Sequence, residues 1–301
     1  MHDLRLRLTA LLLLSLLLAP LAQANGDPDT HPHYQQDQQA SSRENATDSD
    51  GDGGGTSASQ TPSQERADDQ TGEKSRYNGL KPVKLEPMEA TYRAQLTRGI
   101  SLSGEATRSL KKRDDGRWDY RFDVDSFIAK IRESAVLSYE DNRVIPHRYR
   151  YSLKGTFIKN RSNRYNFDWD NMTVLDLDKN RRQDISDYPQ IQDQLTAQLQ
   201  LWVDLKAGKK TMEYVIVDNG GTKDYQFEVL GEETIETENF GKVDTIRVWR
   251  IRDEDSPRST HMWFAPEWNY LLVKLEQREE GGEDFDIHLQ KADIQGQSIR
   301  P

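Results

Sequence analysis

The chain has 301 residues, of which 34% are hydrophobic, and its mean hydropathy is −0.91. These values are low for a chain that folds throughout, so part of it cannot belong to a core. The sequence contains no cysteine, which excludes disulfides, thiolate metal sites and a cysteine for lipid attachment. A formal net charge of −10 gives no reason to expect nucleic acid as a partner.

Residues 1–24 have the pattern of a secretory signal peptide. Arg5 and Arg7 precede a leucine-rich apolar run, and Ala22 and Ala24 supply the small side chains that a signal peptidase reads. The run covers about eleven residues, whereas a membrane-spanning helix needs about twenty. We therefore expect cleavage after Ala24, export to the periplasm and no transmembrane segment in the mature chain.

Residues 25–80 predict a disordered acidic leader. They include eight Asp and three Glu against four Lys and Arg, and seven apolar residues. So few apolar side chains cannot offset the entropy that ordering would cost. Residues 48–53 imitate the start of a calcium loop, but Ser59 stands where such a loop needs a glutamate. We interpret this run as a solvated linker and expect residues 81–301 to fold as a single domain.

Alternation of apolar and polar residues predicts strands along most of residues 81–301. The expected strands are 92–97, 99–104, 118–124, 131–139, 147–153, 164–169, 173–177, 211–217, 224–230, 233–237, 243–251, 261–264, 270–277 and 285–289. Asn, Asp and Gly mark the turns between them, as in residues 219–221 and 281–282.

One segment changes to a helical period. Its apolar residues recur every three or four positions and are Tyr188, Ile191, Leu195, Leu199 and Trp202. This spacing predicts an amphipathic helix over residues 186–205, capped by Ser186 or Asp187 and ended by Gly208. Helical patterns are otherwise missing between the strands, so parallel crossover units are not expected. The expected fold is mainly β: a strongly curved antiparallel sheet, or an incomplete β-barrel, with one main α-helix packed against it.

Several motifs carry a family resemblance. They are Tyr92 with Gly99 and Gly104 in the opening hairpin, the helix, the run 241–248, and the run His-Met-Trp-Phe-Ala-Pro-Glu-Trp at residues 261–268. Together they make residues 90–292 resemble domain-of-unknown-function family 3108 (DUF3108), found in exported proteins of Gram-negative bacteria. The resemblance implies a periplasmic protein without an assigned activity. The order of strands and helix is also similar to that of open-barrel lipoprotein carriers of the periplasm, an analogy at the level of the fold.

The search for catalytic motifs gives little. Asp253, Glu254 and Asp255, close to His261, carry groups that acid–base or glycosidic chemistry uses. Pro257 favours the simpler interpretation of a charged hairpin tip. The histidines show no ligand spacing, so we expect no metal and no cofactor.

Large aromatic residues are the stronger signal for a site. A curved sheet can fill its concave side with such rings, and this interpretation is favoured because strand alternation explains most of them. The other interpretation is a cleft for an acyl chain or a sugar, with a basic mouth. Its residues would be Trp118, Tyr120, Tyr165, Trp169 and Trp202, with Arg148 and Arg164 at the mouth.

The sequence therefore leaves more than one class of function open. The favoured hypothesis is a non-catalytic cell-envelope binding protein whose partner is a lipid, a lipoprotein, an envelope glycan or another protein. The alternatives are a hydrolase that acts on glycan through paired carboxylates, and a purely structural envelope scaffold. The sequence leaves the identity of the ligand and the oligomeric state open.

Overall fold

The computed structural model describes residues 80–98, 100–156, 159–253 and 255–301. The expected signal peptide and the expected leader, with its run 48–53, lie outside the described residues except for Leu80. Among the described residues, no helix combines the length and the apolar character that a membrane span requires.

The described residues form one antiparallel sheet. Its strands are β1 (Met88–Arg98), β2 (Ile100–Lys112), β3 (Trp118–Ser126), β4 (Ala129–Glu140), β5 (Arg143–Gly155), β6 (Arg161–Asp168), β7 (Thr173–Asp176), β8 (Arg181–Asp184), β9 (Thr211–Asp218), β10 (Gly221–Thr237), β11 (Gly241–Ile251), β12 (Arg258–Ala265), β13 (Leu271–Glu279), β14 (Glu283–Ile294) and β15 (Gln297–Ile299). The strand order is β8-β7-β6-β5-β4-β3-β2-β1-β14-β13-β12-β11-β10-β9, and β15 pairs with β14. The first and last long strands, β1 and β14, thus meet in the middle of the sheet.

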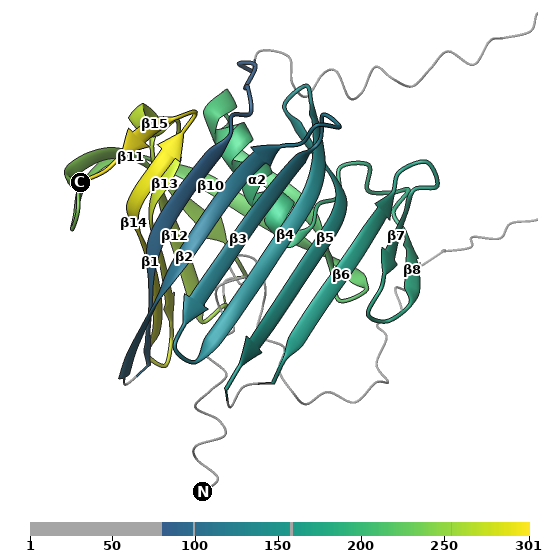
Figure 1. The fold of residues 1–301 in the computed structure, drawn as a ribbon, viewed down its shortest axis with the longest axis horizontal. Helices are drawn as coiled ribbons and strands as arrows, with labels where there is room; N and C mark the ends of the chain where they lie inside the picture. The colour runs from purple at the N-terminus through teal and green to yellow at the C-terminus, as the bar shows by residue number, and fades with distance from the viewer. Residues whose placement is uncertain (1–79, 99, 157–158, 254) are drawn as a thin grey trace, which may run out of the picture. The chain divides into compact units, whose positions relative to one another are not determined.

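The sheet curls around the helix α2 (Gln194–Ala207), which lies on its concave side (Figure 1). The two edges meet at one turn, where the Asn219 amide donates to the Tyr165 hydroxyl at 3.2 Å. The Asn219 carbonyl accepts from Arg181 Nη2 at 2.9 Å. The sheet is therefore an incomplete barrel, and the mainly β fold with one helix that the sequence predicts is confirmed.

The predicted start of the helix is wrong. The helix begins after Asp193, whose carboxylate accepts from the Leu195 and Thr196 amides at 2.9 and 2.8 Å. Thr196 completes the capping box by accepting from the Asp193 amide. Residues 186–192 are not helical because Gln192 bridges to β9, donating to Val215 and accepting from Val217. Gly208 ends the helix at a φ of 101°, as predicted.

The predicted polar face of the helix is also buried rather than exposed. The side chain of Gln200 bonds to the main chain instead of to water. It accepts from the Val144 amide at 2.7 Å and donates to the Asn142 carbonyl at 2.9 Å. Asp204 accepts from the Tyr214 hydroxyl at 2.9 Å. The helix therefore runs through the interior of the sheet instead of covering it from outside, and its glutamines fix its position.

Three strand predictions need correction. The second strand does not stop at Gly104 but continues as β2 to Lys112. The strands expected over 224–230 and 233–237 form one strand, β10, with a register shift between Val229 and Gly231. Strands β8 and β15 were not predicted, because each has at most four residues and no long alternation.

Residues 81–87 close one end of the interior. Val83 and Leu85 are buried there. The Val83 amide donates to Asn142 Oδ1 at 2.7 Å, and the Val83 carbonyl accepts from the Tyr139 hydroxyl at 2.6 Å. This segment is part of the packed domain.

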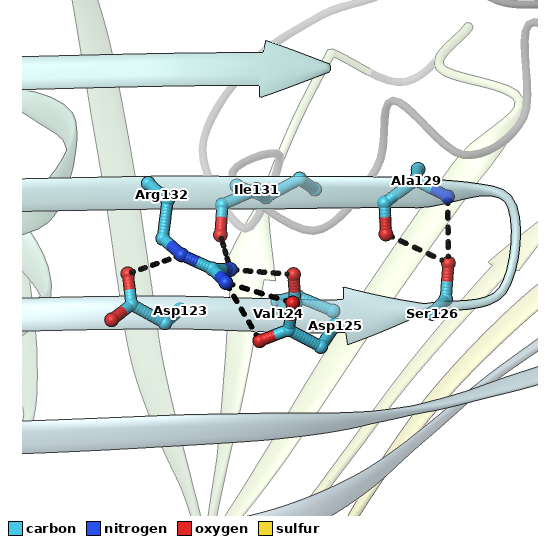
Figure 2. A network of polar contacts seen from close by, with 7 residues as sticks. All are labelled: Asp123, Val124, Asp125, Ser126, Ala129, Ile131 and Arg132. Carbon is cyan, nitrogen blue, oxygen red and sulfur yellow. Dashed lines mark hydrogen bonds and ion pairs between the residues drawn. The ribbon is translucent and has the colours of Figure 1, made fainter. Parts of the chain in front are cut away.

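The β3–β4 hairpin at the opposite end is braced by its own polar groups, as Figure 2 shows. Ser126 Oγ donates to the Ala129 carbonyl at 3.0 Å and accepts from the Ala129 amide at 3.1 Å. Arg132 spans both strands, bonding the Val124 carbonyl at 3.0 Å and Asp125 Oδ1 at 2.7 Å. The turn holds Phe127 fully exposed, at 100% of its surface. This side chain therefore contributes nothing to the core.

Candidate ligand cavity

A cavity lies between α2 and the inner face of the sheet. The helix contributes Gln198, Leu199 and Trp202, and the sheet contributes apolar side chains such as Leu110 and Phe264. Its volume is about 50 Å³. At about 10 to 15 Å³ a molecule, that volume holds a few waters or a short segment of chain. We call this space the interior cavity.

Arg108 is the buried cation of the interior cavity. It lies on β2, where the alternation of Ala106, Arg108 and Leu110 turns its side chain inward, and it is 7% exposed. Its Nη2 donates to Gln198 Oε1 at 2.7 Å. The guanidinium lies 5.0 Å from the centre of the Phe122 ring and 5.8 Å from that of Tyr120. Arg108 Nε is buried and has no hydrogen-bond partner.

Tyr92 brings a second unpartnered group to the cavity. It lies on β1 opposite Ala106, so it is a diagonal neighbour of Arg108 on the same face. The side chain is 1% exposed, and its hydroxyl makes no hydrogen bond. Burial raises the pKa of Tyr92, against the opposing effect of Arg108, so the hydroxyl keeps its proton and can donate it.

Two buried carboxyl groups lie beyond this face. Glu133 on β4 accepts from the Tyr149 hydroxyl at 2.6 Å. Burial, with a smaller contribution from Asp193, raises the pKa of Glu133 to about 8 against the hydrogen bond from Tyr149 and the charge of Arg108. Burial also raises the pKa of Asp193 to about 7, against the hydrogen bonds from Thr196 and Leu195. At neutral pH Glu133 is therefore mainly uncharged and does not neutralise Arg108.

The mouth of the cavity is held by Asn269. Its carbonyl accepts from Trp202 Nε1 at 2.9 Å, and its Nδ2 donates to Glu86 Oε2 at 3.3 Å. Lys206 donates to the Asn269 side chain and places its ammonium 4.9 Å from the centre of the Trp202 ring. Asn269 follows the short helix η2 (Pro266–Trp268) and has a φ of 56°. These contacts join the helix, the η2–β13 turn and the N-terminal segment across the opening.

The structure separates the aromatic residues that the sequence singled out. Tyr120 and Trp202 line the interior cavity. Trp118 is buried and lies under the ammonium of Lys112. Tyr165 stacks on Tyr149 with ring centres 5.7 Å apart. Trp169 stacks on Phe167 and donates to the Pro146 carbonyl at 2.7 Å. The last three rings are core contacts away from the cavity lining.

The two arginines expected at the mouth lie on the outer face of the sheet. Arg148 and Arg164 are both exposed, and Arg164 Nε pairs with Asp178 Oδ1 at 2.7 Å. Next to Arg148 on β5 lies buried Tyr149, and next to Arg164 on β6 lies buried Tyr165, as strand alternation requires. The structure therefore does not bring them together with Tyr120 and Trp202.

The acidic run near His261 forms a hairpin tip. Asp253 and Asp255 are exposed, and Glu254 lies outside the described residues. His261 packs against the Trp263 ring at 6.1 Å, and burial lowers the pKa of His261. In the part of the chain that the structure describes, no group of three His, Asp or Glu residues could hold a metal ion.

Sequence reasoning missed Arg108 and Tyr92 as site residues. The signal was present, since Arg108 stands at an inward position between Ala106 and Leu110. It was lost because the second strand was ended at Gly104, which left Arg108 outside any strand. Tyr92 was recognised as a strand residue, but the missing partner of its hydroxyl depends on tertiary packing.

Comparison with known proteins identifies the family. The family described as "Protein of unknown function (DUF3108)" matches residues 91–290. The chain belongs to the DUF3108 family. The match covers most of the residues that line the interior cavity in this DUF3108 chain, while Glu86, Met88 and Ile294 lie outside it.

Solved structures share features with the DUF3108 chain at low identity. A β-barrel-like protein of domain of unknown function DUF1849 from Brucella abortus is 13% identical, with 71% of this chain and 99% of that chain covered and a TM-score of 0.47. A putative outer membrane lipoprotein-sorting protein domain from Vibrio parahaemolyticus is 11% identical, with 74% and 90% covered and a TM-score of 0.21. No curated protein matches the DUF3108 chain.

Proposed function

We propose that this protein is a non-catalytic cell-envelope protein that binds an apolar or amphipathic ligand in the interior cavity. One observation carries the proposal: a mainly apolar space remains inside the core, and it is lined by two side chains, Arg108 and Tyr92, that each hold a buried polar atom without a partner. Interiors are normally close-packed and their buried polar groups bonded, so this combination is typical of a binding site.

The two alternatives find less support. A glycan hydrolase needs two carboxyl groups with contrasting pKa values on a cleft that substrate can enter. Glu133 and Asp193 have pKa values raised in the same direction, and neither lines the interior cavity. A pure scaffold gains nothing from the space beside Leu199, which a larger side chain would fill.

Location in the periplasm is part of the proposal and rests on residues 1–24. The basic start, the short apolar run and Ala22-Gln23-Ala24 favour cleavage after Ala24. N-terminal sequencing of protein from the periplasmic fraction should begin at Asn25. Membrane-bound protein that still begins at Met1 would contradict this part of the proposal.

Dye binding tests the proposal. An environment-sensitive apolar dye should bind the folded full chain and be displaced by a long-chain alcohol. Leu199→Trp should reduce dye affinity about tenfold or more, since it fills the cavity from the helix. Phe127→Trp is the matched control, because it adds an indole at an exposed turn and should change nothing.

A second variant protects the test against misfolding of Leu199→Trp. Trp202→Ala opens the mouth by removing a ring that lines the cavity, so dye affinity should rise while a cooperative thermal transition remains. Absence of dye binding to the wild type, or equal binding by the wild type and a folded Leu199→Trp variant, would refute the proposal.

A further inference from the structure

The interior cavity contains a cation without a counter-ion. Arg108 has the Gln198 amide oxygen, the Tyr120 hydroxyl and aromatic rings as neighbours, and it forms no ion pair within the described part of the chain. A buried guanidinium is strongly unfavourable unless an anion or a full set of acceptors compensates it. Its Nε and the hydroxyl of Tyr92 are both buried hydrogen-bond donors without acceptors.

The groups around Arg108 do not supply the missing negative charge. Glu133 uses one carboxyl oxygen to accept from Tyr149 and is mainly protonated at neutral pH. Asp193 uses one oxygen to cap α2. Glu86, the one acidic residue that lines the cavity, accepts from Asn269 at the mouth. Arg108 and Tyr92 therefore line the same small space, and Arg108 Nε and the Tyr92 hydroxyl have no hydrogen-bond acceptor there.

We propose that the ligand of the interior cavity is an amphiphile with an oxyanion head, whose oxygens accept from Arg108 Nε and the Tyr92 hydroxyl. This inference rests on the proposed function and adds the class of ligand. Guanidinium groups bind carboxylate and phosphate with charge-assisted hydrogen bonds, and a phenol can add a further donor. The head would replace the missing counter-ion, which gives the ligand an affinity that an uncharged chain lacks.

The rest of the cavity suits the apolar chain of a ligand whose head lies at Arg108 and Tyr92. The cavity is also lined by the apolar side chains of Leu110, Leu199, Phe264 and Leu272. The volume of about 50 Å³ takes only a short piece of chain. A longer chain has to pass Trp202 and break its hydrogen bond to the Asn269 carbonyl. We therefore expect affinity to grow with chain length and Trp202→Ala to speed binding of the longer ligands.

Paired ligands that differ only in the head test the proposal. Displacement of the apolar dye from the full chain is measured with dodecanoate, dodecanol and a lysophospholipid with a terminal phosphate. The wild type should prefer dodecanoate to dodecanol by about tenfold or more. A stronger preference for the phosphate ligand would assign the head to a phospholipid, and a stronger preference for dodecanoate would assign it to a free fatty acid.

Variants assign the preference to the two donors. Arg108→Met keeps a side chain of similar length without charge. Dodecanol should therefore still bind, and its affinity should equal that of dodecanoate. Tyr92→Phe removes only a hydroxyl and should lower the preference about threefold. Arg121→Met, on the exposed side of β3, is the matched control and should leave the preference unchanged.

The failures of the two proposals are distinguishable. If the wild type binds dodecanol as tightly as dodecanoate, or if a folded Arg108→Met variant keeps the preference, the oxyanion head is refuted while the apolar site stands. If neither compound displaces the dye and the dye itself does not bind, the proposed function fails, and the inference fails with it. Should Arg108→Met not fold, Tyr92→Phe decides alone, because it keeps the size of the ring.

Discussion

At the scale of single residues, burial inside the sheet keeps a carboxyl group protonated at a pH where it would be ionised in the unfolded chain. The Glu133 carboxyl is fully buried, and its pKa is raised from 4.5 to about 8 mainly by burial. The folded protein therefore holds this proton between about pH 4.5 and pH 8, where the unfolded chain has lost it. The folded state binds more protons than the unfolded state, so Glu133 makes stability fall as the pH rises through this window.

Glu133→Gln should remove this dependence. The glutamine oxygen can still accept from the Tyr149 hydroxyl, but the side chain no longer ionises. We expect the variant to match the wild type near pH 5 and to exceed it by about 2 to 4 kcal/mol near pH 9, measured by urea unfolding. The exposed carboxyl of Glu105 gives the control variant Glu105→Gln, which should show no such gain. Parallel stability curves for Glu133→Gln and the wild type would contradict this assignment.

The candidate site shows how far residue patterns reach. Aromatic content selected Tyr120 from a strand with period-two alternation and Trp202 from a helix, and both line the interior cavity. The same content also selected Trp118, Tyr165 and Trp169, because a ring in the core and a ring in a site have the same pattern in sequence. The sequence did not single out Arg108, because the inward position of its side chain follows only from the full extent of the second strand.

At the scale of elements, the start of α2 is decided by one side chain. Asp193 caps the helix through the Leu195 and Thr196 amides. Asp193→Ala should lower the free energy of unfolding by about 1 to 2 kcal/mol, because two buried amides lose their acceptor. Asp193→Asn keeps the acceptor without the buried charge and should cost less. Asp187→Ala, at the exposed residue that the sequence favoured as a cap, should change the free energy of unfolding by less than about 0.5 kcal/mol. A larger loss from Asp187→Ala than from Asp193→Ala in urea unfolding would contradict this.

The helix was predictable in kind but not in its start or its surroundings. The spacing of Leu195, Leu199 and Trp202 gives the helical period, and Gly208 gives the end. Tyr188 and Ile191 continue the same spacing by coincidence, because their segment is tied to β9 through Gln192. That the glutamines face buried main chain follows from the curl of the sheet, which no local pattern reports.

At the scale of the whole molecule, the turn around Asn219 closes the incomplete barrel. Gly220 has a φ of 88°, and a β-carbon there would lie 0.8 Å from Arg181 Nη2. Gly116 has a similar φ of 84° with open space around it. Gly220→Ala should therefore cost about 1 kcal/mol more than Gly116→Ala, because it adds displacement of Arg181 to the same backbone strain.

Hydrogen exchange locates this effect. Gly220→Ala should speed exchange of the β7 and β8 amides, since these strands form the edge that Arg181 ties to the Asn219 carbonyl. Gly116→Ala should leave those amides unchanged. Equal exchange of β7 and β8 in the two variants would show that the turn does not hold the edge.

The class of fold could be predicted from alternation along the chain, whereas its closure could not. Each hairpin joins strands that are neighbours in sequence, so strand order follows from turns such as those at Gly116 and Gly281. The pairing of β1 with β14 joins residues almost two hundred positions apart, as in Tyr92 with Leu289. No local signal specifies that pairing, and the interior cavity depends on it.

If the interior cavity holds an amphiphile by its head, a bound fatty acid has a defined direction inside the sheet. A crystal structure of the protein with a fatty acid brominated at its far end measures that direction. We expect carboxylate density between Arg108 Nε and the Tyr92 hydroxyl, with the anomalous peak of bromine toward Trp202 and the mouth. A bromine peak only on the outer surface, with the cavity occupied by water or by rearranged side chains, would contradict the claim.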